Sequence, residues 1–233
     1  MPFDPQVVDT RPSSERDLVI GLPQQIAGYD PINWNVCRPQ LTGNFASVLE
    51  KASDEKPLQK FFEEYPEALL TGLVKPHIGW VIPRPRLPKP DGGCVPDFII
   101  CEWSSVGPDW IIVELESPTT SPFTKSGAIS QICNHAAEQI NGYKDYIEQH
   151  GHFLRDHGWP KLHGVCEGII VIGRRNDPGR SKYADKLRAF KRQQISVASY
   201  DRLFEECQFM QAVFCRWEED LARLTKDVSN RTT

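Results

Sequence analysis

Three acidic residues stand at positions where they could bind a metal ion together. Glu114 and Glu116 are two apart in the apolar stretch that runs from Trp110 to Glu116. Side chains alternate along a strand, so these two carboxylates share one face, about 7 Å apart. Asp97 lies in the preceding apolar stretch. With Trp103 opposite Trp110, Asp97 would face Glu116 and lie diagonal to Glu114, which places all three on one side of a hairpin.

A divalent cation is the chemistry that this cluster suits. Clustered carboxylates repel one another unless a cation lies between them, and hard ions such as Mg²⁺ or Mn²⁺ prefer oxygen ligands. Such an ion can polarise a phosphodiester and help to generate hydroxide. The expectation depends on the register, because a slip of one residue would move Asp97 to the other face. The alternative is a strand that ends in solvent, where the glutamates need no ion.

The elements that must position these residues alternate between helix and strand. Gly107 and Pro108 mark a turn between the two acidic strands. The pattern of apolar residues predicts a helix from Phe45 that ends at Pro66, strands over Val95–Trp103 and Trp110–Glu116 with a turn at Ser104–Asp109, a helix over Gly127–His150, a buried strand over Gly168–Gly173, a basic helix over Ser181–Arg192, a strand over Ile195–Ala198 and a helix over Asp201–Leu224. This order predicts an α/β fold with a mixed sheet.

Composition predicts an ordinary soluble domain with a short arm. Residues 1–44 hold six prolines with little periodicity and are expected to form an extended arm, whereas residues 45–233 should form one domain with a C-terminal helix. Seven cysteines, an odd number, argue against a disulfide framework. No signal sequence or membrane-length apolar run is present, so we expect a cytoplasmic protein with no membrane contact.

Four pieces of the sequence carry a family resemblance. They are Phe61–Pro66, the pair Pro96–Phe98 and Val113–Pro118, the helix piece His135–Ile140 with Tyr143, and the pair Gly168–Arg174 and Ser199–Leu203. In order and spacing they resemble the nuclease domain of Shedu antiphage-defence proteins, within the PD-(D/E)xK nuclease superfamily. The similarity covers roughly residues 45–206 and implies a restriction-endonuclease-like core.

The resemblance also implies roles for individual residues. Asp97 and Glu114 would be metal ligands, while Gln139 and an acid of the first helix, Glu63, would line the site of a metal-dependent endonuclease. The superfamily usually has lysine two residues after the glutamate, where this chain has Glu116. Glu116 could hold a second metal ion or orient the attacking water, and Lys125 is the candidate for a displaced lysine. A nuclease-fold regulatory protein without catalysis is the main alternative.

A basic segment near the C-terminal third predicts contact with nucleic acid. Eight basic and two acidic residues between 174 and 192 give +6, and since the whole chain carries −4, the rest carries −10. Arg174, Arg175, Arg180 and Lys182 would contact phosphates without reading sequence. The alternative is a solvated helix face. DNA is the expected partner, with RNA left open, and a homo-oligomer or a separate sensing partner is also possible.

Two other functions receive less support. The residues His150, His152, His157, His163 and Cys166 match no standard zinc spacing and should form a polar surface loop. A carboxylate pair could also hydrolyse a glycan, but the basic segment and the family resemblance argue against it.

Overall fold

A mixed sheet of six strands forms the centre of the molecule. The computed structural model describes residues 25–33, 38, 40–74, 78–87 and 95–231. The strands lie in the order of the chain, β1 (Ile32–Asn33), β2 (Ile78–Pro83), β3 (Phe98–Ser104), β4 (Gly107–Leu115), β5 (Glu167–Val171) and β6 (Ile195–Ala198). The strands from β1 to β4 pair antiparallel, and β4, β5 and β6 pair parallel. The predicted α/β class with a mixed sheet is confirmed.

The β3–β4 hairpin has a different register from the predicted one. Phe98 lies opposite Val113, and Trp103 lies opposite Pro108 rather than Trp110. The predicted turn was too long, because the strands are joined by two residues and β4 already begins at Gly107, whose φ is 123°. The shift is two residues, an even number, so each side chain keeps its predicted face. Continuing this register places Asp97 opposite Glu114 instead of Glu116.

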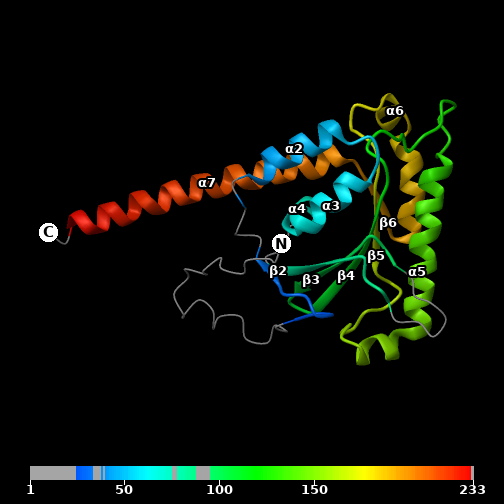
Figure 1. The fold of residues 1–233 in the computed structure, drawn as a ribbon, viewed down its shortest axis with the longest axis horizontal. Coiled ribbons are helices and arrows are strands. Elements are labelled where there is room, and N and C mark those ends of the chain that lie inside the picture. The colour runs from blue at the N-terminus through cyan, green and yellow to red at the C-terminus, as the bar shows by residue number, and fades with distance from the viewer. Residues whose placement is uncertain (1–24, 34–37, 39, 75–77, 88–94, 232–233) are drawn as a thin grey trace.

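Helices cover both faces of the sheet (Figure 1). One layer consists of α2 (Leu41–Lys51), α3 (Lys56–Glu64), α4 (Pro66–Leu73) and α7 (Tyr200–Arg231), and α5 (Gln131–Asp156) covers the other face. Alternation along β3 and β4 supplies both cores. Phe98 and Val113 pack with the first layer, and Ile99 and Ile112 pack with α5. Between β5 and β6 lie α6 (Pro178–Leu187) and the 3₁₀ helix η1 (Arg188–Gln193).

The helices depart from prediction where burial overrides periodicity. The helix α4 was not predicted, because most of it is buried and shows no amphipathic alternation. Pro66, predicted to end α3, begins α4 at a position that suits proline. α2 begins at Leu41, inside the predicted arm, and buries Leu41, Phe45 and Leu49 on one face. α5 starts at Gln131 after the cap Ser130, whose hydroxyl accepts from the N–H of Cys133.

The described part of the predicted arm packs on the domain. Ile26 is buried among the α5-side residues, and the N–H of Ala27 donates to the carbonyl of Gly158. Residues 1–24 of that arm lie outside the described residues. Within the described ranges, no helix has both the length and the apolar character to cross a membrane.

Candidate metal centre

Asp97 and Glu114 form a carboxylate pair at one end of the central strands β3 and β4, which we call the carboxylate edge of the sheet. Asp97 directly precedes β3, Glu114 lies near the end of β4, and the register sets them opposite each other, where Cβ atoms are about 4.5–5.5 Å apart. The N–H of Leu115 donates to Oδ2 of Asp97 at 2.8 Å. Tyr143 of α5 hydrogen-bonds to the carboxyl of Glu114, and the two acidic side chains interact directly. Sequence alternation therefore predicted the shared face correctly.

Burial and mutual repulsion raise the pKa of both acids. Burial is the main cause for Glu114, which is 6% exposed, and the charge of Asp97 adds to it, raising the pKa of Glu114 to about 8. Burial also raises the pKa of Asp97, although the N–H of Leu115 and the charge of Arg84 oppose the rise. Two carboxyls held so close, with so little solvent, ionise together only with a cation beside them.

Glu116 belongs to the same edge but has different neighbours. Burial, followed by the charges of Glu55 and Asp97, raises its pKa to about 7. Its carbonyl accepts a hydrogen bond at 2.7 Å from the hydroxyl of Tyr200, which is fully buried at the start of α7. Tyr200 thus ties the segment after β4 to α7. Glu55 was not predicted as a site residue; it is the N-cap of α3, eight residues before Glu63.

The chemistry of the pair fits a divalent ion. Oε1 of Glu114 is buried and has no hydrogen-bond partner among the described residues, an arrangement that costs free energy unless something else binds there. Across the described part of the chain, no group of three or more His, Cys, Asp or Glu side chains is placed to hold a metal ion. An ion at this edge would therefore use two carboxylates, which suits Mg²⁺ because it keeps several waters and binds substrate phosphate.

Glu63 lies in a polar row along α3 rather than beside the pair. Gln59 is buried and donates from Nε2 to Oε1 of Glu63 at 3.0 Å. The same oxygen lies 3.3 Å from Nε of Arg84. The charges that act on Asp97 come from Arg84 and Glu55. The structure therefore connects Glu63 to the carboxylate pair through Arg84.

The remaining predicted site residues lie around this edge with less contact. Gln139 is half-buried on α5, one turn before Tyr143. Lys125 is exposed at the tip of a tight turn, closed by the N–H of Gly127 donating to the carbonyl of Thr124. Lys125 is not among the charges that shift the pKa values of the three acids. Its role as a displaced lysine stays a prediction.

All three of the predicted phosphate-binding arginines have partners within the protein. Arg174 forms a two-pronged contact with Asp201, with its Nε and Nη2 at 2.9 Å and 2.8 Å from Oδ1. Arg175 pairs with Glu205 at 2.6 Å. Arg180 donates from Nη2 to the carbonyls of Ile172 and Ala198. Of the four predicted residues, Lys182 is exposed and lies over the ring of Tyr183.

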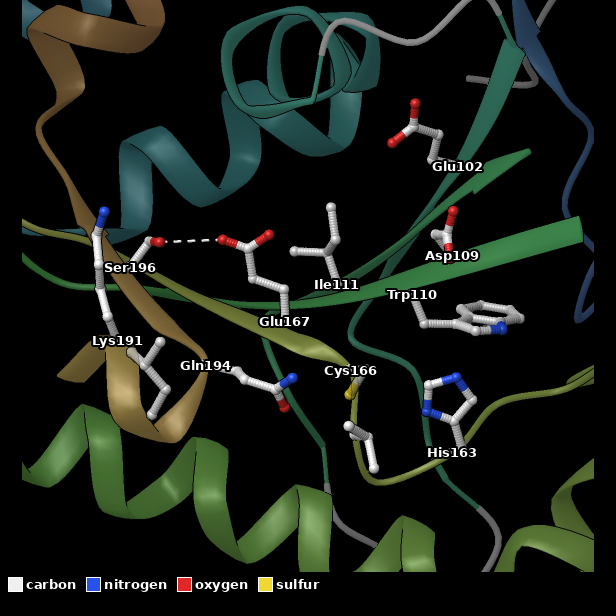
Figure 2. Close-up of a pocket in the computed structure, with 12 residues that line it drawn as sticks. Glu102, Asp109, Trp110, Ile111, His163, Cys166, Glu167, Lys191, Gln194 and Ser196 are labelled. Atoms are coloured by element: carbon white, nitrogen blue, oxygen red, sulfur yellow. Dashed lines mark hydrogen bonds between the residues drawn. The ribbon is translucent and has the colours of Figure 1, made fainter. Parts of the chain in front are cut away.

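A cavity at the opposite edge of the sheet carries acidic residues (Figure 2). Its volume is about 530 Å³, and its polar lining includes Glu102, Asp109, His163, Glu167 and Lys191. Glu102 and Asp109 are direct cross-strand partners, and Glu167 accepts from the hydroxyl of Ser196 at 3.0 Å. Three acids against one lysine disfavour a polyanion in this cavity.

Comparison with known proteins agrees with the motif-based resemblance. The family model described as Shedu protein SduA, C-terminal, matches residues 52–204, which is more than half of the chain. The chain belongs to this Shedu family. A search of curated proteins finds no match. Among solved structures, the chain is similar to restriction endonuclease FokI bound to DNA, with a TM-score of 0.43 and 13% identity, over 76% of this chain and 28% of that chain.

The Shedu motifs have visible structural roles. The pieces Gly168–Arg174 and Ser199–Leu203 are joined by the contact between Arg174 and Asp201. Tyr200 of the second piece also donates a hydrogen bond to the carbonyl of Glu116, in the piece Val113–Pro118. The N–H of Tyr200 also donates to the carbonyl of Gly173 at 3.2 Å. These contacts hold the ends of β4 and β5 against α7, so the motifs fix the edge on which the carboxylates stand.

Proposed function

We propose that the chain is a metal-dependent endonuclease that hydrolyses phosphodiester bonds of DNA in antiphage defence. Membership of the Shedu family supports a defence nuclease. The observation that carries the proposal is the pair Asp97–Glu114, with Oε1 of Glu114 buried and unpartnered beside a second acid. A site that combines buried acids with raised pKa values is a candidate for catalysis.

The metal ion would be held mainly by the pair. Asp97 and Glu114 would bind Mg²⁺ or Mn²⁺, together with the carbonyl of Leu115. When bound, such an ion polarises the phosphodiester and lowers the pKa of water. The N–H of Leu115 and the side chain of Tyr143 orient the two carboxylates, which is the supporting role that neighbours of metal ligands usually have.

Glu116 is the candidate for the general base. Its pKa is raised to about 7 without a bound ion, an ion beside it would favour its ionised form, and the carboxylate could accept the proton that water loses as the water oxygen bonds to phosphorus. The ester P–O bond breaks on the opposite side, and the leaving oxygen takes up a proton, so the net change is the addition of one water. A second ion held by Glu116 is the other assignment for this residue. Gln139 and Glu63 would complete the surroundings, and Lys125 remains the candidate for a lysine supplied by a loop.

Incubation with nucleic acids tests the proposal. Purified protein is mixed with supercoiled, linear and single-stranded DNA and with RNA, in Mn²⁺, in Mg²⁺ and in EDTA. We expect products from DNA with either ion and none in EDTA. Intact substrates under every condition would support the alternative, a nuclease-fold regulatory protein without catalysis.

That alternative has one observation in its favour. Glu116 occupies the position where the superfamily usually has lysine, and a glutamate cannot supply positive charge to a phosphoryl group. DNA binding without cleavage would be its signature, and the same incubation, followed by a binding assay, separates the two.

A further inference from the structure

The carboxylate edge contains a cation that the Shedu motifs do not include. Arg84 directly follows β2, and its N–H donates to the carbonyl of Asp97 at 2.8 Å. Its φ is 43°, in the left-handed region, which is unfavourable for a residue with a side chain. With this φ the backbone turns away from the extended conformation of β2 at Arg84, beside Asp97.

The guanidinium of Arg84 is held in place but remains accessible. Its Nε lies 3.3 Å from Oε1 of Glu63, which Gln59 fixes from the buried side. The side chain of Arg84 is 63% exposed. Within the described residues, no hydrogen bond from its Nη1 or Nη2 is found, so both NH2 groups can face a ligand. Its positive charge also opposes the rise in the pKa of Asp97 that burial causes.

A cavity with basic and aromatic lining adjoins Arg84. Its volume is about 640 Å³, and it is lined by residues that include Arg84, Arg86, Tyr29 and His157. Among the described residues, no acid contributes to the lining, in contrast to the cavity at the opposite edge. Arginines bind phosphate through paired N–H groups, and aromatic rings accept stacked bases. The cavity therefore suits a nucleotide.

We propose that Arg84 contacts the phosphodiester that is cleaved, and that the cavity beside it holds the adjoining nucleotide, with Arg86 on its phosphate. Arg84 then supplies the positive charge that Glu116 does not. Glu63 is a positioning residue, because it acts through Arg84. This inference rests on the proposed nuclease function and names the substrate contacts of the same site.

Binding and cleavage by three variants test the assignment. Arg84→Gln, Arg84→Lys and Arg86→Gln are compared with the parent, and Arg216→Gln, an exposed change on α7, is the control. Affinity for a labelled oligonucleotide is measured in Ca²⁺ over a range of salt concentrations, and cleavage is measured in Mn²⁺. Melting temperatures establish that each variant is folded.

The two arginines should give different results. Arg84→Gln should lower the cleavage rate at saturating DNA by roughly 10²-fold, as loss of one charge-stabilising donor does, and reduce the slope of log affinity against log salt by about one. Arg84→Lys should keep the slope and recover part of the rate. Arg86→Gln should reduce the slope by about one and raise KM while leaving kcat unchanged. Arg216→Gln should match the parent.

The outcomes separate this inference from the function on which it rests. A parent protein that cleaves, combined with an Arg84→Gln variant of unchanged rate and slope, overturns the role of Arg84 and leaves the nuclease standing. If Arg84→Gln does not fold, a full rate for Arg84→Lys together with an unchanged slope for Arg86→Gln overturns the site. A parent that neither binds nor cleaves in either assay contradicts the nuclease proposal itself.

Discussion

At the scale of the residue, the carboxyl of Glu114 is the group that most needs a partner. It is buried, it faces Asp97, and one of its oxygens has no hydrogen bond from any described residue. Its ionised form is therefore unfavourable in the protein without a bound cation, and replacing it changes stability and metal binding in opposite directions. Two predictions follow from this single residue.

The first prediction concerns stability against pH without metal. The pKa of Glu114, about 8 in the folded chain, lies above its ordinary value of 4.5. Between these values the folded state keeps a proton that the unfolded chain has lost, so stability falls as pH rises through this window. Glutamine does not titrate, so Glu114→Gln should not lose stability in this pH window. At pH 8.5 the free energy of unfolding of the variant should therefore exceed that of the parent by on the order of 2–4 kcal/mol. Denaturant unfolding at pH 5 and pH 8.5 measures it, and an equal pH response in both proteins would contradict it.

The second prediction concerns the protons that a metal ion displaces. An ion binds the ionised carboxylates, so it competes with the protons that Glu114 and Glu116 hold below pH 7–8. Mn²⁺ should raise the melting temperature of the parent more at pH 8.5 than at pH 6, and should not raise that of Asp97→Asn at either pH. Differential scanning fluorimetry gives the comparison. A Mn²⁺ shift that Asp97→Asn retains would place the ion elsewhere.

At the scale of the element, the hydroxyl of Tyr200 in α7 forms a hydrogen bond to the segment that follows β4. Tyr200→Phe removes the hydrogen bond to the carbonyl of Glu116 and leaves that carbonyl without this partner, which should cost about 1–3 kcal/mol. For a domain of this size, each kcal/mol lowers the melting temperature by roughly 2–4 °C. Tyr29→Phe, at a half-exposed tyrosine, is the control and should change little. A Tyr200→Phe variant as stable as the parent would show that Tyr200 is held by packing alone.

The basic segment at the start of α6 gives a second prediction at this scale. Because Arg174 and Arg175 are paired with Asp201 and Glu205, replacing them perturbs the fold as well as the surface charge. Lys182→Gln avoids that ambiguity, since Lys182 is exposed. If the segment contacts DNA phosphates, Lys182→Gln reduces the salt slope of binding by about one at unchanged melting temperature. An unchanged slope would mean that the segment is a solvated helix face.

Sequence patterns predicted the strands of the hairpin better than the register in which the strands pair. Alternation placed Asp97, Glu114 and Glu116 on one face, because strand periodicity is a local property. The register depends on the turn, and two apolar tryptophans suggested a pairing that the short Ser104–Gly107 connection does not allow. The roles of Arg84 and Glu55 depend on contacts between distant segments, which no local pattern contains. A signal for Arg84 did exist, since Arg84-Pro85-Arg86 is a basic run between apolar segments.

At the scale of the whole molecule, the two edges of the sheet differ in charge. One edge carries Glu102, Asp109 and Glu167 around its cavity. The other combines the buried acids with Arg84, Arg86 and a cavity to which no described acid contributes. If the chain has the proposed function, a polyanion bound at the second edge would meet cations first and would reach the acids at the proposed metal site. This asymmetry is the way in which a chain with a net charge of −4 would act on DNA through one local surface.

The most direct test of this account is Mn²⁺-dependent cleavage of supercoiled DNA by the parent, by Glu114→Gln and by the control Glu102→Gln at the opposite edge. We expect the parent and Glu102→Gln to cut at similar rates, and Glu114→Gln, although folded, to lose activity by roughly 10³-fold or more. Cleavage by Glu114→Gln at the rate of the parent would contradict the account, because every role proposed for this edge requires that carboxylate.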